Sequence, residues 1–163
     1  MDLAGLLKLV HALVGIVLVT GLVGRWVTLG YAGRIGDLRS MRAVLGLGVI
    51  FERMVIASSL FVLVLGLLTA MAQGRPFLGP LQGAPVDWLF VSLILYLSVS
   101  FLVPLVFLPK GRVFQAALDE ATTRGEVTDE LRAAYRDRVV LGAHVYELVA
   151  VTIVLILMIA KPF

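Results

Sequence analysis

The sequence predicts an all-α protein, a single membrane domain over residues 1–163 that forms a four-transmembrane-helix bundle. Composition is the first reason: 60% of the residues are hydrophobic and 15% are charged, whereas soluble domains carry about 25% charged residues. A soluble globule of this length lacks the polar surface to cover so many apolar side chains. Length is the second reason, because four stretches reach the roughly 20 apolar residues that cross a bilayer. An ordinary soluble enzyme and a disordered chain are excluded.

The predicted spans cover residues 3–29, 43–72, 86–108 and 139–160. The first apolar stretch is too long for a signal-peptide core and shows no small-residue cleavage pattern, so we expect a retained helix. Glycine and proline recur in residues 73–85, which predicts a loop with turns between the second and third spans. Pro104 predicts a kink within the third span.

The connector from residue 111 to residue 138 is predicted to be a helical hairpin on the cytoplasmic side, between the third and fourth spans. Gly125 is expected to end its first helix. Thr128 is a predicted N-cap, with Asp129 and Glu130 in the favourable first turn. No strong helix breaker occurs between this cap and Pro162, so the pattern predicts one helix of about 32 residues, roughly 48 Å long, that includes the fourth span.

Charge asymmetry predicts the orientation of the chain. Ten Lys and Arg residues lie in or beside the connectors after the first and third spans, against three on the opposite side. Cytoplasmic loops carry such an excess, so both termini are expected outside, in a cell membrane that we take to be the bacterial inner membrane. Trp26 and Trp88 fall near the predicted interfaces, as amphipathic rings do. No basic run indicates nucleic acid as a partner; the lipid bilayer is the expected surroundings.

Absent residue types exclude several chemistries. The chain has no cysteine, which excludes disulfides, iron–sulfur clusters, thiolate nucleophiles and covalently attached haem. No nucleophile motif or phosphate-binding loop is present either. The catalytic residues are therefore unknown, and whether the chain is an enzyme stays open.

Ionisable residues inside the spans are the informative positions, because they are costly in lipid and face a bundle interior or a functional site. Glu52 and Arg53 lie in the inner part of the second span, and His144 and Glu147 lie at similar depth in the fourth. His144 and Glu147 are three residues apart and share a helix face. These four residues are predicted to form a buried polar network, in which Arg53 or Arg25 neutralises the carboxylates.

The same residues permit other interpretations. A proton or quinone site is one alternative. A metal site with Glu52, His144 and Glu147 as ligands is another, although a di-metal carboxylate bundle needs more carboxylates and paired Glu-x-x-His motifs. We therefore expect no metal.

His11 stands apart from the network. At about 1.5 Å per residue, it should lie about 7 Å outward of the midplane and His144 about 9 Å inward. The two axial ligands of a haem are only about 4 Å apart, so these histidines should not share one metal. Arg25, some 21 Å from His11 along the helix, is expected to snorkel to the inner headgroups. His11 either bonds to a neighbouring span or binds haem b as an axial ligand.

The first span also carries a family resemblance. Lys8, His11, Gly21 and Arg25 form a pattern similar to the opening helix of the HemJ-type protoporphyrinogen oxidases, within the copper-resistance-D-like superfamily. Residues 111–163 resemble a branch of that superfamily whose members are described as predicted integral membrane proteins. The resemblance implies haem b as a cofactor, with His11 as its ligand.

These observations support three hypotheses about function. The first is a membrane redox protein that holds haem b at His11. The second is a non-catalytic membrane subunit or assembly scaffold, either a homo-oligomer or part of a larger complex, favoured by the missing catalytic constellations. The third is a proton-coupled transporter that uses Glu52, His144 and Glu147.

Overall fold

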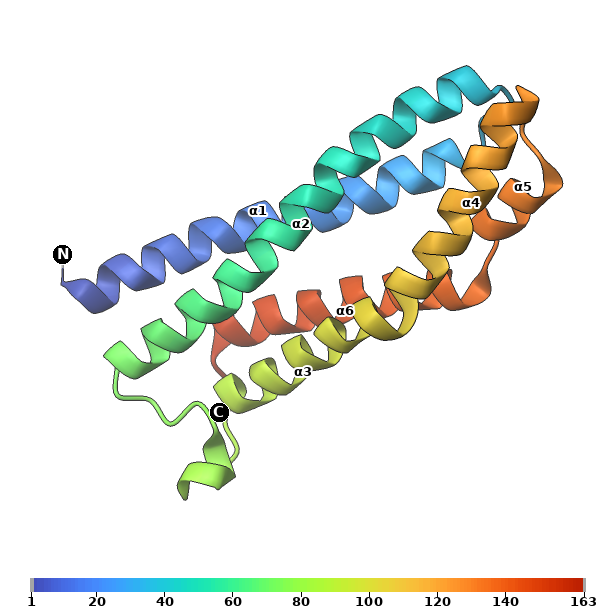
Figure 1. The fold of residues 1–163 in the computed structure, drawn as a ribbon. Helices are drawn as coiled ribbons and strands as arrows, with labels where there is room; N and C mark the ends of the chain where they lie inside the picture. Colours follow the sequence, from blue (N-terminus) through green and yellow to red (C-terminus); the bar gives the residue numbers. More distant parts are fainter. Residues whose placement is uncertain (1, 163) are drawn as a thin grey trace.

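The computed structural model describes residues 2–162, and every regular element in that part of the chain is helical (Figure 1). Its α-helices are α1 (Leu3–Ala32), α2 (Leu38–Ala72), α3 (Trp88–Leu102), α4 (Leu108–Arg124), α5 (Asp129–Tyr135) and α6 (Arg138–Ala160). A 3-10 turn, η1 (Gly79–Gln82), lies in the loop after α2, and a π turn, η2 (Val103–Phe107), joins α3 to α4. Four helical segments are long and apolar enough to cross a membrane. The predicted fold class is confirmed.

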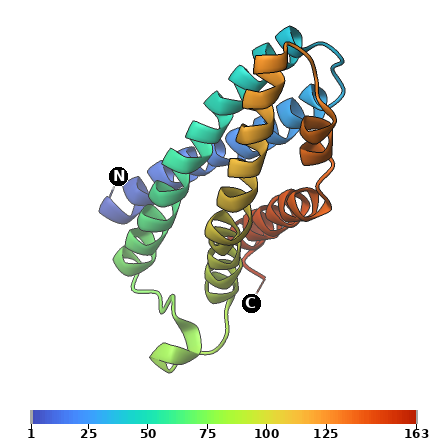
Figure 2. The same cartoon turned by 45° about the vertical axis from the view of Figure 1, so that its right-hand side comes forward.

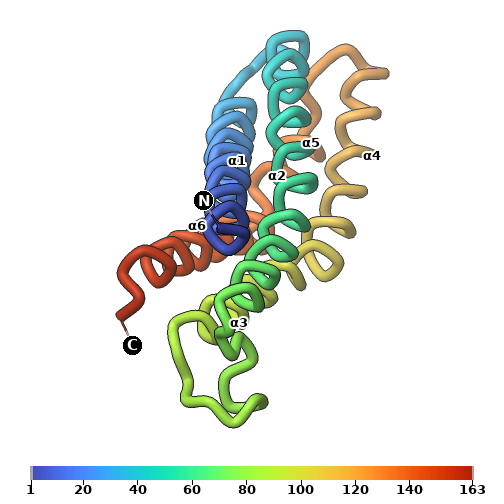
Figure 3. Tube along the Cα trace, turned by 90° about the vertical axis from the view of Figure 1, so that its left-hand side faces the viewer, coloured from blue at the N-terminus to red at the C-terminus, as the bar shows by residue number. Residues whose placement is uncertain are grey.

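The spans are arranged as two antiparallel pairs. The α1/α2 pair forms one hairpin, and the α3/α6 pair lies beside it at an angle (Figures 1 and 3). Both chain ends and the loop after α2 lie at one end of the molecule. The links after α1, after α4 and after α5 lie toward the other end, to which α4 continues the course of α3 (Figure 2). This sidedness agrees with the topology that the charge pattern predicts.

Glycine makes the α1/α2 pair tight. A Cβ atom on Gly24 would overlap the Phe51 ring, and one on Gly21 would lie 2.9 Å from Val55. Only hydrogen at these two positions allows the backbone of α1 to approach the side chains of α2 so closely. Small residues serve this purpose in membrane helices, where packing rather than the hydrophobic effect holds neighbours together.

The two pairs meet through apolar contacts at two levels. Near the middle, Leu18, Leu22 and Val55 of the α1/α2 pair pack with Val151 of α6. At the end with the termini, Ala70 of α2 packs with residues of the α3/α6 pair, among them Trp88. A third contact, which is charged, lies toward the opposite end and is centred on Arg25.

Trp88 begins α3 at the end of the molecule that carries both termini. The guanidinium carbon of Arg75 lies 5.6 Å from its ring centre, and the ammonium of Lys161 lies 5.5 Å from it. Cations at this range from an indole face are attracted by its π electrons. Trp88 therefore ties the loop after α2 and the C-terminal end to the start of α3, whereas Trp26 is exposed on α1.

The helix of the third span does not stop near residue 108, the predicted end of the span, but continues without a break into the connector, to Arg124. Pro104 lies in the π turn of this long helix. Proline lacks the N–H that the helix ladder requires, and a π turn is one way to absorb such a defect without ending the helix. Gly125, in the left-handed conformation with φ 76°, ends α4 as predicted.

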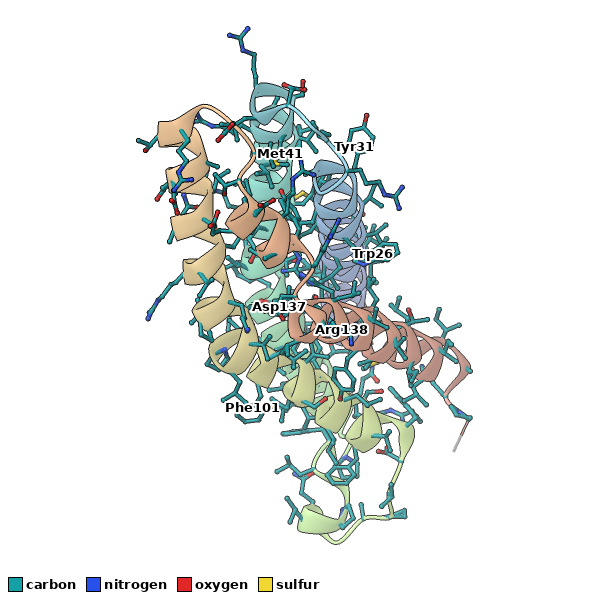
Figure 4. All side chains as sticks on the ribbon, turned by 90° about the vertical axis from the view of Figure 1, so that its right-hand side faces the viewer. Trp26, Tyr31, Met41, Phe101, Asp137 and Arg138 are labelled. Atoms are coloured by element: carbon teal, nitrogen blue, oxygen red, sulfur yellow. The ribbon has the colours of Figure 1, made fainter. Side chains whose placement is uncertain are left out.

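The expected helix of about 32 residues is divided by Asp137. Thr128 caps α5 as predicted, but α5 ends at Tyr135. The Asp137 carboxylate then accepts hydrogen bonds from the N–H groups of Val139 and Val140, and it pairs with Lys110 at 2.6 Å. Because an N-cap carboxylate satisfies the first free N–H groups of a helix, a new helix begins there. Figure 4 shows Asp137 at this junction of α5 and α6.

A separate apolar cluster lies beyond the spans, at the end opposite the termini. Met41 of α2, Ala117 and Ala121 of α4, Leu131 of α5 and Ala32 of α1 are buried together there. The second helix begins at Leu38, five residues before its predicted start, because Asp37 accepts a hydrogen bond from the N–H of Ser40. The helical connector is therefore packed on the ends of α1 and α2.

Candidate functional site

Arg25 is the centre of a charged contact between the two helix pairs. Its side chain comes from α1 and is only 5% exposed. One nitrogen, Nη1, donates to Oε2 of Glu52 on α2 at 2.9 Å. The other, Nη2, donates to Oε2 of Glu147 on α6. A single guanidinium thus binds carboxylates from two other helices, and its planar fork of donors suits this role.

Two aromatic rings complete what we call the Arg25 cluster: Arg25, Glu52, Glu147, His144 and Phe107. The His144 Nδ1 lies 3.5 Å from Oε2 of Glu147, one α6 turn away. The Phe107 ring stacks on the imidazole with 4.7 Å between ring centres. Arg25 lies over the same Phe107 ring, with its guanidinium carbon 5.4 Å from the ring centre. Phe107 therefore holds both the histidine and the arginine, at a distance typical of aromatic and cation–π contacts.

Burial is uneven across the cluster. The side chains of Arg25 and Glu147 are each 6% exposed, whereas that of Glu52 is 44% exposed. The Arg25–Glu147 pair is therefore desolvated and depends on its partners for stability. Glu52 is the member that remains open to the surroundings.

The cluster contains more negative than positive charge. Two carboxylates share one guanidinium, which leaves a formal charge of −1 when His144 is neutral. A proton on His144 or on either carboxylate brings the sum to zero. An uncompensated charge in lipid is costly, so the arrangement can take up one proton on a defined set of atoms.

The structure brings three of the four predicted network residues together and leaves one outside. Arg53 is exposed, and the ion pairs of residues 2–162 do not include it. Successive residues of an α-helix point about 100° apart, so Glu52 and Arg53 cannot both face α1 and α6. Of the two arginines that could neutralise the carboxylates, Arg25 is the one that does so, and it does not extend to the headgroups as was also expected.

Phe107 was not predicted as a site residue. Its neighbour Pro104 indicated an irregular helix, but the sequence does not show that the π turn directs Phe107 toward His144.

His11 lies between α1 and α2, fourteen residues and about 21 Å along the helix from Arg25. Its Nδ1 is buried and has no hydrogen-bond partner among the described residues. A Cβ atom on Gly66 of α2 would lie 3.0 Å from the ring, so the imidazole fills the space that this glycine leaves. The Nδ1 atom therefore lies against α2. Haem b binding at His11 stays a prediction.

Metal ligands do not converge in the part of the chain that the structure describes. No group of three His, Asp or Glu side chains there is placed to hold a metal ion. His144 contacts Phe107 and Glu147, whereas His11 contacts Gly66, so the two histidines have separate surroundings.

Comparison with known families identifies the chain. A family model described as "Predicted integral membrane protein (DUF2269)" matches residues 5–162. The chain belongs to this family. Its description agrees with the four apolar spans of the structure, and the match covers both the spans and the helical connector. Comparisons with curated proteins and with solved structures found no match. The family description names no cofactor, so the copper-resistance-D-like resemblance stays a prediction.

Proposed function

We propose that this protein is a proton-coupled protein of the cell membrane, in which the Arg25 cluster binds and releases one proton and thereby controls the contact between its two helix pairs. One observation carries the proposal: a single buried guanidinium is shared by carboxylates from two different helices, with an imidazole beside one of them.

The charge sum supports proton exchange at this place. The deprotonated cluster has one negative charge more than it can neutralise internally, and burial makes that charge costly. A proton on one of these side chains would restore neutrality. Glu52, which is exposed, offers a route by which the proton reaches the cluster. Intramembrane carboxylate and histidine chains serve as proton relays in pumps and transporters.

The position of the cluster supports coupling to a conformational change. Among the ion pairs of residues 2–162, Arg25–Glu147 is the only one that joins the α1/α2 pair to the α3/α6 pair. A protonated Glu147 would still accept a hydrogen bond, but it would lose the charge that strengthens it. Protonation would thus loosen this charged contact, while the apolar contacts and the hydrogen bond from Tyr96 of α3 to the Ser59 carbonyl of α2 remain.

We favour this proposal over haem b at His11 because the Arg25 cluster joins charged side chains of three helices, whereas the His11 ring is packed beside Gly66 of α2. The orientation is part of the proposal. If the basic connectors face the cytoplasm, the cluster lies on the cytoplasmic side of the membrane and exchanges its proton there.

A distance measurement tests the proposal. The chain has no cysteine, so cysteines introduced at Ile56 on α2 and Val149 on α6, both exposed, carry spin labels without competing sites. In liposomes, we expect the label distance to differ between about pH 8 and about pH 5, because uptake of a proton changes the charge of the cluster. Glu147→Gln should abolish the change and keep the low-pH distance.

The matched control is Glu126→Gln, which removes an exposed carboxylate from the loop after α4. It should respond to pH as the parent protein does. A parent protein whose label distance is the same at both pH values would refute the proposal and leave the cluster a purely structural ion pair. A pH response that persists in Glu147→Gln would refute it as well.

A further inference from the structure

Arg53 presents a charge to the surface of the membrane-spanning part. It is the neighbour of Glu52 on α2 and is therefore level with the Arg25 cluster, but it points away from it. Exposed cations at such depth are rare, because lipid cannot solvate them. None of the ion pairs within residues 2–162 satisfies Arg53. Its guanidinium is therefore available to an anionic group outside the described chain.

The side chain of Arg53 can reach the membrane surface. Phe107 relates the level of Arg25 to the start of the connector, because its ring contacts Arg25. It lies three residues before Lys110, a distance of about 4.5 Å along the helix. Lys110 pairs with Asp137 where the charged connector begins. Arg53 is level with Arg25, so its long apolar stem can carry the guanidinium to the headgroup level, as arginine does near the ends of spans.

An apolar groove extends from Arg53 along the α1/α2 pair. The groove has a volume of about 510 Å³, and Arg53 is its one charged lining residue; we call it the Arg53 groove, lined by Val14, Val17, Ile50, Arg53, Met54, Ala57, Ser58 and Phe61. From Ile50 to Phe61 it covers twelve residues of α2, or about 16 Å. Half of a hydrocarbon core about 30 Å thick is about 15 Å. The groove is therefore about as long as one leaflet is deep.

We infer that the Arg53 groove is a binding site for one anionic phospholipid of the inner leaflet. The guanidinium would bind the phosphate and the remaining anionic headgroup, and an acyl chain would lie along Ala57 and Phe61, which follow Arg53 on α2. The amphipathic character of the groove, charged toward one end and apolar along its length, matches that of a phospholipid. Anionic lipids supply the negative charge that basic residues at this surface attract.

Native mass spectrometry of the purified full-length protein tests this site. The protein is prepared in mild detergent and mixed with phosphatidylglycerol or with phosphatidylcholine. We expect the parent protein to retain phosphatidylglycerol preferentially. Arg53→Gln should lower that retention about fivefold, the effect of one basic residue at an anionic surface. The matched control is Arg112→Gln, which removes an exposed arginine of α4 outside the groove and should retain lipid as the parent does.

Two further variants separate binding from folding. Arg53→Lys keeps the charge and should keep most of the bound phosphatidylglycerol. Ala57→Phe fills the groove, keeps Arg53 and should lose the lipid. Circular dichroism and thermal unfolding verify that each variant is folded, and if Arg53→Gln does not fold, Ala57→Phe decides.

Three results would overturn the inference: equal retention of the two lipids by the parent protein, equal retention by Arg53→Gln and Arg112→Gln, or a lipid-bound Ala57→Phe. A lipid-free dimer that Arg53→Gln dissociates would overturn it too, because a second copy of the chain would then cover the groove.

Discussion

Replacing Arg25 by glutamine should destabilise the protein far more than any other single change of charge in its spans. The Arg25–Glu147 pair is 6% exposed on both sides, and removing one partner of a buried pair costs about 3–5 kcal/mol in free energy of unfolding. The Arg25–Glu52 pair is half open on the Glu52 side, so it adds at most about 1 kcal/mol. We therefore expect a loss of about 3–5 kcal/mol, dominated by the stranded carboxylate of Glu147.

The double variant Arg25→Gln/Glu147→Gln makes this reasoning specific. It removes both buried charges, and neutral replacements of a buried pair are often tolerated. It should recover most of the lost stability, so the two changes should be strongly non-additive. Arg53→Gln is the matched control, since it removes an exposed arginine of the neighbouring helix at the same level and should change stability by less than about 0.5 kcal/mol.

The measurement is reversible unfolding in mixed micelles with increasing denaturing detergent, monitored by circular dichroism. An Arg53→Gln variant as unstable as Arg25→Gln would refute the geometry of the cluster. So would a double variant that is no more stable than Arg25→Gln alone, because the cost would then not arise from the unpaired Glu147.

Three other predictions concern a glycine, a helix cap and a histidine. Gly24→Ala should lower the free energy of unfolding by about 1–3 kcal/mol, because its Cβ would overlap the Phe51 ring; Gly30→Ala, which has open space, should not, and equal losses in the same unfolding assay would contradict this. The hydrogen bond from the Ser40 N–H lowers the pKa of the Asp37 carboxyl. The stability that this carboxylate contributes is therefore present above about pH 4 and is lost as the pH falls through its native pKa. As the pH falls through this range, the unfolding temperature of Asp37→Asn should decline less than that of the parent protein. Identical declines in the two proteins would argue against this role of Asp37. If haem b binds at His11, protein from a haem-rich host shows a Soret band that His11→Ala abolishes, and a colourless parent protein would exclude this cofactor.

The four spans were predictable because apolar length is a quantity that a sequence carries directly. The orientation taken from the distribution of Lys and Arg stays a prediction. The turn chemistry of the connector was also readable: Gly125 ends one helix and Thr128 begins the next. Asp137 escaped prediction because aspartate interrupts a helix only where it finds free N–H groups to cap, and that choice is stabilised by Lys110, 27 residues earlier.

For the charged site, the sequence predicted the depth of each residue along its helix but not the direction in which its side chain points around the helix axis. Counting residues placed Glu52, Arg53 and Arg25 on their helices, and depth alone made either arginine a suitable partner for Glu147. Which of the two arginines pairs with Glu147 depends on how each helix is rotated about its axis. This rotation is determined by close contacts such as that of Gly24 with Phe51. Those contacts join residues far apart in the chain, so no local pattern reveals them.

The π turn between α3 and α4 makes the length of this long helix intolerant of change. A π turn holds one residue more than the α-helical pattern requires, and each added residue rotates the remainder of the helix by about 100°. The residues before it pack on α6, and Ala117 and Ala121 after it pack on α2 and α5. A deletion of one residue within Val103–Phe107 would restore a regular helix, yet it would turn either Phe107 or these alanines away from their partners. We therefore expect insertions and deletions to be accepted in the loop after α2, and selected against in this segment of the chain.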